Sequence, residues 1–268
     1  MVTAETRLVG LIGDPVSHSL SPRMQNAAFA ARGLDWAYVP LAVPGERLED
    51  AVEGLVALGF AGANVTIPHK TAVVGFCDEL DEVAERAGSV NTLVVEDGRV
   101  LASSTDGPAV VSLVEAEGAE TVLLGAGGAA QAVATSLLHA GAASLTVAAR
   151  NPERAHALVA RLKTLFPDRE VNAAEGWPSE EDATLVVNAT PVRDEPLAWP
   201  RPEQQVVDLA YNPDRRPTAL VEAARAAGCD RVVDGLEVLI AQGAQSFERW
   251  TGIAAPRDVM HAALRSSP

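Results

Sequence analysis

The stretch that decides the fold is Gly125-Ala126-Gly127-Gly128-Ala129-Ala130. It follows a short apolar segment that reads as a buried strand, and a helix is expected from Gly128 to Ala140. The pattern G-x-G-x-x-A is typical of dinucleotide binding: the first glycine makes the turn, the second lets the backbone approach a pyrophosphate, and the small third residue permits close helix–strand packing. Helix N-terminal amides then face the phosphates. The sequence predicts a dinucleotide-binding domain, and a structural glycine turn is the alternative.

The end of the next expected strand bears on the choice of cofactor. An NAD site usually carries an acidic residue there for the ribose hydroxyls, whereas this chain reads Ala149-Arg150-Asn151-Pro152-Glu153-Arg154. Arginine suits a 2′-phosphate because its planar fork binds phosphate bidentately. The pattern therefore favours NADP, with Arg150 and Arg154 as candidates to hold its phosphate. The alternative is that these arginines are simply the solvated start of a helix.

Outward from this stretch, apolar strand candidates alternate with amphipathic helix candidates, which is typical of an α/β fold with largely parallel sheets. Before residue 106 we expect strands at Arg7–Gly13, Trp36–Leu41, Gly62–Ile67, Val90–Val95 and Arg99–Ser103, and helices at Pro22–Arg32 (with Ser21 as N-cap), Glu46–Leu58 and Glu79–Ala87. After it we expect strands at Thr121–Leu124, Ser144–Ala149, Thr184–Asn188, Gln205–Leu209 and Arg231–Val233, and helices at Gly128–Ala140, Pro152–Leu165, Thr218–Ala227, Leu236–Trp250 and Pro256–Leu264.

These elements predict two domains. Residues 1–105, completed by C-terminal helices in 237–268, form an α/β substrate-binding and catalytic domain with a mostly parallel sheet. Residues 106–236 form a Rossmann-like NADP-binding domain, and a deep cleft is expected between the two.

Composition excludes several classes of protein. The formal net charge of −15, with no local basic patch, argues against a nucleic-acid or anionic-membrane partner. No apolar stretch reaches the ~20 residues of a membrane span, and the N-terminus lacks a secretory pattern. The two cysteines, Cys77 and Cys229, fit a reducing cytoplasm. No cluster has metal-ligand spacing, so no metal is expected. We expect a cytoplasmic monomer or homodimer that acts on a small molecule.

Three polar clusters in the first domain stand where expected strands end: Ser17–Ser21, Asn64–Lys70 and Ser104–Asp106. Strand ends that face a crevice are where α/β proteins place their ligands. Of the 21 basic residues only Lys70 and Lys163 are lysines, and lysine, unlike arginine, can give up its proton near neutral pH. Lys70 is therefore a candidate for proton transfer.

In this order and spacing the motifs resemble the shikimate dehydrogenase family along nearly the whole chain. His18-Ser19-Leu20-Ser21-Pro22 looks like the serine pair that binds the substrate carboxylate, and Asn64–Lys70 is similar to the catalytic lysine motif. Ser89-Val90-Asn91-Thr92 and Ser104-Thr105-Asp106-Gly107 resemble the segments of the substrate asparagine and the catalytic aspartate. In the second half of the chain, the nicotinamide-side loop of the family is resembled by Val187–Thr190, and its tyrosine segment by Asp208–Pro213. The segment that gives a backbone contact to nicotinamide and a glutamine to the substrate is resembled by Asp234–Gln242.

The resemblance implies NADP-dependent, reversible reduction of 3-dehydroshikimate to shikimate, a step of aromatic amino-acid biosynthesis. Lys70 would be the acid/base, with Asp106 orienting it, because a lysine beside a carboxylate can give and take the alcohol proton. The implied substrate-binding residues are Ser19, Ser21, Thr66, Asn91, Tyr211 and Gln242. The implied cofactor-binding residues are Gly125, Ala126, Gly127, Gly128, Ala129, Ala130, Arg150, Asn151, Arg154, Thr190 and Gly235.

The chain departs from the family pattern in places. Glu237 and Val238 stand where glycine and methionine are usual, Ser104 replaces asparagine, and Ala109 replaces glycine. Ala149 and Asn151 flank the cofactor arginine in place of asparagine and threonine. Two alternatives therefore stay open: a quinate or aminoshikimate dehydrogenase of the same superfamily, and a catalytically weak NADP-sensing homologue. A methylene-tetrahydrofolate dehydrogenase also pairs a lysine-bearing domain with a Rossmann domain, but the serine pair and Ser104-Thr105-Asp106-Gly107 fit it poorly.

Overall fold

The computed structural model describes residues 2–177, 182–229 and 231–265. The chain divides into two compact units. The first unit comprises Met1–Thr105 and Ile240–Pro268, and the second unit comprises Asp106–Leu239. The second boundary falls three residues later than the sequence placed it. Each unit is built on its own six-stranded sheet.

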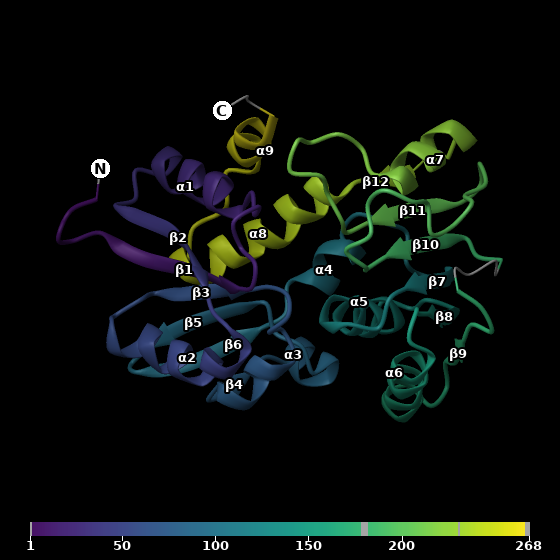
Figure 1. Ribbon diagram of the computed structural model, residues 1–268, viewed down its shortest axis with the longest axis horizontal. Coiled ribbons are helices and arrows are strands. Elements are labelled where there is room, and N and C mark those ends of the chain that lie inside the picture. Colours follow the sequence, from purple (N-terminus) through teal and green to yellow (C-terminus); the bar gives the residue numbers. More distant parts are fainter. Residues whose placement is uncertain (1, 178–181, 230, 266–268) are drawn as a thin grey trace. The chain divides into compact units, whose positions relative to one another are not determined.

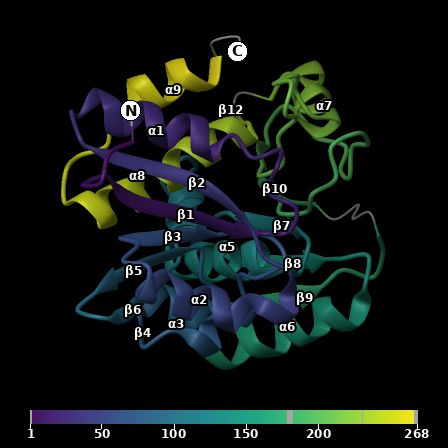
Figure 2. The same ribbon diagram turned by 60° about the vertical axis from the view of Figure 1, so that its left-hand side comes forward.

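The sheet of the first unit has the strand order β2-β1-β3-β5-β6-β4 (Figure 1). Strands β2, β1 and β3 are parallel, β5 runs antiparallel to β3 and β6, and β4 is parallel to β6. Helices lie on both faces of this sheet, with α1 and α9 on one and α2 and α3 on the other (Figures 1 and 2). The strands are β1 (Arg7–Gly13), β2 (Trp36–Ala42), β3 (Gly62–Val65), β4 (Glu79–Leu80), β5 (Thr92–Glu96) and β6 (Arg99–Ser103). The helices are α1 (Ser21–Ala31), α2 (Leu48–Ala57), α3 (Glu82–Ala87) and α9 (Arg257–Arg265), with short 3-10 helices η1 (Gly45–Arg47) and η2 (Ala72–Phe76). Helix α8 (Gly235–Thr251) begins in the second unit and belongs to the first unit from Ile240 onward.

Two expectations for the first unit are wrong. The segment Glu79–Ala87, expected to be one helix, is the edge strand β4 followed by the helix α3. The helix begins after Asp81, because the Asp81 side chain caps it by accepting a hydrogen bond from the Ala84 amide. Leu80, Val83, Ala84 and Ala87 have helical spacing, so the periodicity hid the short strand. Ser21 is not an N-cap either. It is the first residue of α1, Leu20 holds the cap position, and the Ser21 amide donates to Ser19 Oγ at 3.2 Å.

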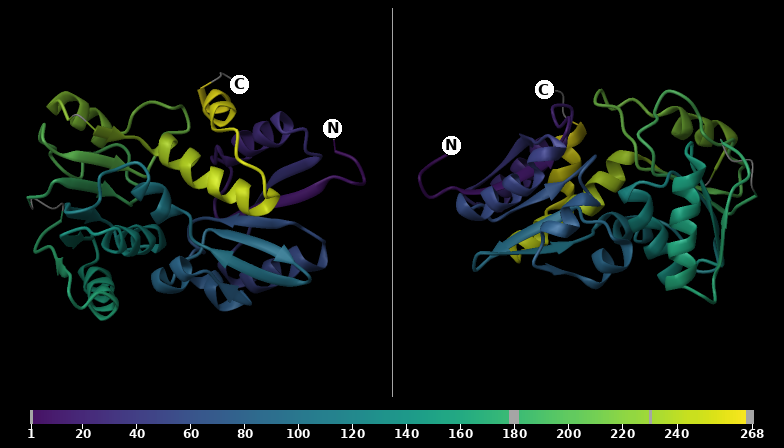
Figure 3. Two further views of the ribbon diagram at one scale, coloured as in Figure 1. Left: turned by 180° about the vertical axis from the view of Figure 1, so that it is seen from behind. Right: turned by 60° about the horizontal axis from the view of Figure 1, so that its bottom comes forward.

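The sheet of the second unit is wholly parallel, in the order β12-β11-β10-β7-β8-β9 (Figure 1), and Figure 3 gives two further views of the same ribbon. β7 and β10 are neighbours in the middle of the sheet. From them the strand order runs outward in opposite directions, three strands on each side, which is the doubly wound Rossmann order. The strands are β7 (Glu120–Leu124), β8 (Ser144–Ala148), β9 (Glu170–Ala173), β10 (Leu185–Asn188), β11 (Gln205–Asp208) and β12 (Arg231–Val233). The helices are α4 (Asp106–Val111), α5 (Gly128–His139), α6 (Pro152–Leu165) and α7 (Ala219–Ala227).

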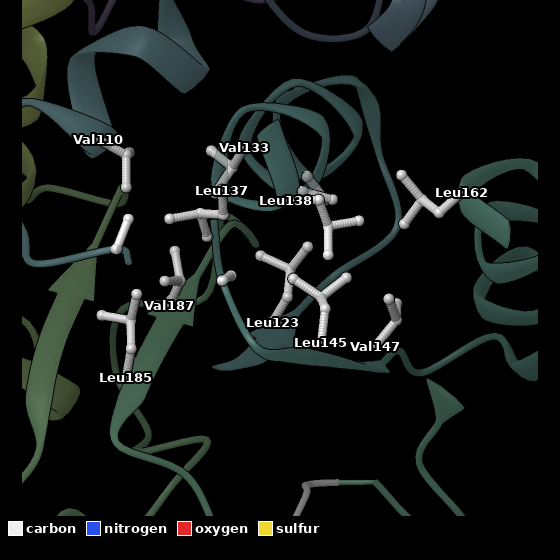
Figure 4. Close-up of a cluster of buried hydrophobic side chains, with 14 of the residues drawn as sticks. Val110, Leu123, Val133, Leu137, Leu138, Leu145, Val147, Leu162, Leu185 and Val187 are labelled. Carbon is white, nitrogen blue, oxygen red and sulfur yellow. The ribbon is translucent and has the colours of Figure 1, made fainter. Parts of the chain in front are cut away.

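Strand alternation divides the apolar core of the second unit between the two faces of its sheet. Leu123, Leu145 and Val187 pack with Leu137 of α5 and Leu162 of α6 (Figure 4). On the other face the intervening residues, such as Val122 and Leu124 of β7, pack with Leu220 and Ala224 of α7. Successive side chains of a strand point to opposite faces, so fully apolar strands need helices on both sides. The α/β class expected from the sequence is confirmed.

A buried polar network crosses the first unit. Asn64 of β3 accepts a hydrogen bond from the Tyr38 hydroxyl at 2.9 Å and donates to the Asn91 carbonyl at 2.9 Å and to Ser246 Oγ of α8 at 3.0 Å. Only 6% of Asn64 is exposed. Its amide therefore ties β2, β3, the start of β5 and α8 together.

Asn64→Leu should lower the free energy of unfolding by about 2–5 kcal/mol, because it leaves several buried partners without hydrogen bonds. Urea denaturation of the full chain measures this. The control is Asn172→Leu, the same change at an exposed position of β9, which should stay within about 0.5 kcal/mol of the wild type. Equal stability of the two variants would contradict the role given to the network.

Within the described ranges, no helix is long and apolar enough to cross a membrane.

Candidate active site

The candidate site begins where strands end: the carboxyl ends of β3 and β6 lie beside the start of the antiparallel strand β5, and together they form the sheet edge of this site. Asn64, Thr92 and Ser103 lie side by side in register. Beyond that register, the Val90 amide donates to the Lys70 carbonyl at 2.8 Å and the Asn91 amide donates to the Ser103 carbonyl at 3.1 Å. The segment that carries Lys70, the segment that carries Asn91 and the end of β6 are therefore held at this one edge.

Asn91 is the centre of the hydrogen bonds at this edge. Its Oδ1 accepts from the Thr105 amide at 2.8 Å, and its Nδ2 donates to Thr105 Oγ1 at 2.9 Å and to Gln242 Oε1 at 3.3 Å. The structure thus brings together two predicted substrate residues, Asn91 and Gln242. Thr105 also fixes the chain immediately before Asp106, which is buried and begins α4.

A buried histidine anchors the segment that carries Lys70. His69 is 2% exposed, and its Nε2 donates to the Val43 carbonyl at 2.6 Å. Its amide donates to the Thr66 carbonyl, and its own carbonyl accepts from the Val73 amide at the start of η2. Lys70 is half-buried beside it. The sequence assigned no role to His69, since nothing in it linked the imidazole to Val43, and the structure makes it a support of the Lys70 segment.

The remaining predicted substrate residues of the first unit lie on neighbouring segments. Ser21 is buried at the start of α1, and Ser19 is half-buried just before it. Gln25, one turn further along α1, donates through Nε2 to the Gly243 carbonyl of α8 at 2.9 Å, which ties the helix of Ser21 to the helix of Gln242. Thr66 follows β3, and its amide donates to the Ile12 carbonyl at the end of β1.

The glycine-rich turn of the second unit has the geometry that its sequence predicts. Gly125 follows β7 with φ +115°, and its amide donates to the Ala148 carbonyl of β8 at 2.7 Å. A Cβ at Gly125 would lie 3.2 Å from the Ala189 carbonyl oxygen, whereas a Cβ at Gly127 would meet no atom within 4 Å. In the described part of the chain no side chain caps α5 at Gly127. Ala126 and Ala129 are half-buried, Gly128 begins the helix, and Ala130 is buried against the core.

The three residues predicted to select NADP follow β8. Arg150 and Arg154 are exposed, and no acidic side chain of the described residues lies within ion-pair distance of either. Asn151 caps α6, because its Oδ1 accepts from the Arg154 amide at 3.2 Å. Two exposed cations without a nearby carboxylate fit the 2′-phosphate of a phosphorylated dinucleotide.

The loop after β10 carries Thr190. Asn188 Oδ1 accepts from both the Thr190 amide at 2.9 Å and the Thr190 hydroxyl at 2.7 Å, and Asn188 Nδ2 donates to Asp208 Oδ1 at 2.9 Å. Tyr211, half-exposed, follows three residues after Asp208. Gly235 packs on the same segment, since a Cβ there would lie 2.1 Å from the Ala210 carbonyl oxygen.

Asp208 is the buried ionisable group of this region. It is fully inaccessible to solvent, and burial raises its pKa from an ordinary 3.8 to about 6, against the opposing effect of hydrogen bonds from Thr218, Ala210 and Asn188. A raised pKa in the folded state means that this carboxylate contributes stability at low pH that is lost as pH rises through about 6. Above about pH 6, the ionised form of Asp208 therefore lowers the free energy of unfolding.

The described residues contain no group of three or more histidine, cysteine, aspartate or glutamate side chains that could hold a metal ion.

Gly127→Ala should weaken NADPH binding about tenfold or more while leaving stability nearly unchanged. The added methyl meets no protein atom, but it occupies the space through which a pyrophosphate approaches the turn. Fluorescence titration with NADPH and thermal unfolding measure the two effects. Gly235→Ala is the comparison, because its methyl meets a backbone carbonyl and should cost stability first. Unchanged NADPH affinity in Gly127→Ala would contradict the assignment of the turn.

Comparison with known proteins extends over nearly the whole chain. Residues 11–93 match the family described as shikimate dehydrogenase substrate binding domain, residues 109–191 match shikimate / quinate 5-dehydrogenase, and residues 235–265 match shikimate 5′-dehydrogenase C-terminal domain. A relative from Moorella thermoacetica, named shikimate dehydrogenase (NADP(+)), is 47% identical and the alignment covers 99% of this chain and 95% of that one.

Two solved structures are similar throughout. One is a shikimate dehydrogenase in complex with NADP+, with a TM-score of 0.88, 35% identity, and coverage of 98% of this chain and 96% of that one. The other is shikimate 5-dehydrogenase from Thermus thermophilus in complex with NADP(H) and shikimate, with a TM-score of 0.83, 33% identity, and coverage of 97% and 99%. With this coverage and identity, the chain belongs to the shikimate dehydrogenase family.

Proposed function

We propose that the protein is an NADP-dependent oxidoreductase that interconverts 3-dehydroshikimate and shikimate. The observation that carries the proposal is the hydrogen-bonded cluster of Asn91, Thr105 and Gln242 at the sheet edge where the Lys70 segment is held and from which the chain continues into Asp106. Family membership and the named relatives support the same reaction.

In this proposal Lys70 and Asp106 do the proton chemistry. The substrate is a secondary alcohol or its ketone, so its oxygen must lose a proton in one direction and gain one in the other. The Lys70 ammonium donates to the oxygen as negative charge develops on it, and the Asp106 carboxylate orients Lys70 and accepts a hydrogen bond from a neighbouring hydroxyl. NADP, when bound, supplies the hydride acceptor, and NADPH the hydride donor.

The other site residues hold the two ligands. Ser19 and Ser21 bind the substrate carboxylate, and Thr66, Asn91, Tyr211 and Gln242 are further substrate-binding residues. The turn formed by Gly125, Ala126, Gly127, Gly128, Ala129 and Ala130 receives the pyrophosphate, and Arg150, Asn151 and Arg154 receive the 2′-phosphate. Thr190 and Gly235 contact the nicotinamide side. The open space at Gly127, the uncapped start of α5 and the two exposed arginines support this arrangement.

The proposal extends to the setting of the enzyme: it acts in the cytoplasm as a monomer or homodimer, on a small molecule.

A substrate and cofactor matrix tests the reaction. The purified protein is offered shikimate or quinate, each with NADP or NAD, and formation of the reduced cofactor is followed by absorbance. We expect the highest kcat/KM with shikimate and NADP. A higher value with quinate would move the assignment to quinate oxidation, and absence of turnover with every pair, in a protein that binds NADPH, would favour a sensor.

A further inference from the structure

A buried chain of hydrogen bonds runs beneath the Thr190 loop. Asp208, at the end of β11, accepts at Oδ1 from Asn188 Nδ2 and from the Ala210 amide, both at 2.9 Å, and at Oδ2 from the Thr218 hydroxyl. Asn188 in turn accepts at Oδ1 from the Thr190 amide and the Thr190 hydroxyl. Thr190 Oγ1 in turn accepts from the Val192 amide at 3.2 Å.

The carboxylate sets the direction of these hydrogen bonds, and the Val192 carbonyl, which accepts from Asn188 Nδ2 at a longer 3.4 Å, favours the same orientation. An ionised aspartate can only accept, so Asn188 must turn its amide nitrogen toward Asp208. Its amide oxygen then faces Thr190 and can accept from the Thr190 amide and hydroxyl together. If a donor replaced the carboxylate oxygen, the two orientations of the Asn188 amide would become closer in energy, and Thr190 would lose its fixed acceptor.

We propose that Asp208 is a positioning residue for the cofactor, which fixes the orientation of the Asn188 amide and thereby holds Thr190 in the conformation that binds NADP(H). The inference rests on the proposed function for the role of Thr190. The same carboxylate holds the Ala210 amide, one residue before Tyr211, so it acts on both loops that follow β10 and β11.

The charge environment of Asp208 makes this device sensitive to pH. Burial raises the pKa of Asp208 to about 6, and the nearby Asp234 carboxylate adds to that increase. Asp234 itself is 3.6 Å from Arg225 of α7, which offsets part of its charge. Asp208 is therefore ionised above about pH 6 and protonated below it, and the hold on Thr190 should weaken as pH falls through this value.

Asp208→Asn is the first test. The variant removes the charge at nearly constant volume, so the fold should persist, but its amide can present a donor to Asn188. We expect roughly 5- to 20-fold weaker NADPH binding, the effect of about one hydrogen bond, with a smaller change in kcat at saturating cofactor. Amide hydrogen exchange of segment 189–192, corrected for intrinsic rates, should be faster than in the wild type without any ligand present.

The pH profile separates positioning from a merely structural role. Wild-type affinity for NADPH and protection of segment 189–192 should both fall between pH 7 and about pH 5.5, whereas protection in Asp208→Asn should be flat. The 2′-phosphate of NADPH titrates in the same range, so the contribution of Asp208 is the difference between the two affinity profiles. Asp168→Asn removes the same charge from an exposed position of the second unit and should keep the wild-type profile.

Thr218→Val is the second variant, which keeps the inference testable should Asp208→Asn not fold. Losing the Thr218 hydroxyl removes a hydrogen bond that favours the charged Asp208, so the loss of protection on acidification should begin at higher pH. Thr218→Ser retains the hydroxyl and should leave the profile in place.

The inference would be overturned if Asp208→Asn left both the NADPH affinity and the protection of segment 189–192 unchanged. It would also be overturned if Thr218→Val lost protection on acidification at the same pH as the wild type. Hydrogen exchange needs neither substrate nor turnover. A protein that shows the exchange effects but does not oxidise shikimate would refute the proposed function while leaving the role of Asp208 in the loop intact.

Discussion

Lys70→Ala is expected to lower kcat by roughly 10²–10⁴ while NADPH binding and stability stay close to those of the wild type. The loss is in kcat because the Lys70 ammonium acts on negative charge that develops at the substrate oxygen in the transition state. The fold should tolerate the change, since Lys70 is half-buried and its hydrogen bond with the Val90 amide is accepted by its backbone carbonyl, which the substitution keeps. Steady-state kinetics, with NADPH fluorescence as a check on cofactor binding, measures the effect.

The chain supplies its own control for this experiment. Lys163, the other lysine, is exposed on α6, and Lys163→Ala should leave kcat unchanged. Asp106→Ala should resemble Lys70→Ala, and the double variant should lose much less than the product of the two single losses if the side chains act as one unit. A Lys70→Ala enzyme that binds NADPH and turns over at nearly the wild-type rate would remove the acid/base assignment.

The sequence could predict the class of fold because periodicity and turn chemistry agree over long stretches. The strand, glycine turn and helix expected from Thr121 to Ala140 each have a local physical cause, and the structure contains all three as β7, the turn at Gly125 and α5. The expectation of the shikimate dehydrogenase family is confirmed by the comparisons. The assignment of roles to individual site residues stays a prediction.

What the sequence could not predict depends on partners that are distant along the chain. The contact of His69 with Val43, and that of Gln25 with Gly243, join segments that no local pattern relates. The sequence put Asp208 in an expected strand and at the start of the tyrosine segment, and only the register of β10 and β11 places it beside Asn188. The strand β4 was missed because two residues at a sheet edge are too few to show a period of two.

The structure shows the surroundings of two departures from the family pattern. Ser104 Oγ is buried without a hydrogen-bond partner among the described residues, where an asparagine side chain is usual. Glu237 stands in the first turn of α8, where its amide donates to the Asp234 carbonyl and side chain. Asp234 thus caps this helix whatever residue occupies position 237, so the glutamate departs from the family without altering the start of α8.

Arg150→Asp is expected to reverse the preference between cofactors. Arg150 is exposed at the end of β8, directly after the strand whose Ala148 carbonyl holds the Gly125 amide, so its position follows from the glycine turn itself. Replacing its guanidinium with a carboxylate removes a charged hydrogen bond of ~1.5–3 kcal/mol to the 2′-phosphate, which corresponds to roughly 10- to 100-fold weaker NADP binding. The new carboxylate can accept hydrogen bonds from the ribose hydroxyls of NAD, so NAD binding should be kept or improved.

The measurement is kcat/KM for NADP and for NAD with the same substrate. Arg169→Asp is the matched control: it makes the same change of two charge units at an exposed position of the second unit, before β9 and away from the glycine turn. If general electrostatic repulsion of a phosphorylated cofactor were the cause, Arg169→Asp would lower NADP efficiency as much as Arg150→Asp does. Selective loss of NADP efficiency in Arg150→Asp alone would locate the discrimination at the 2′-phosphate, whereas equal losses for NADP and NAD would show that Arg150 supports the cofactor site without selecting the cofactor.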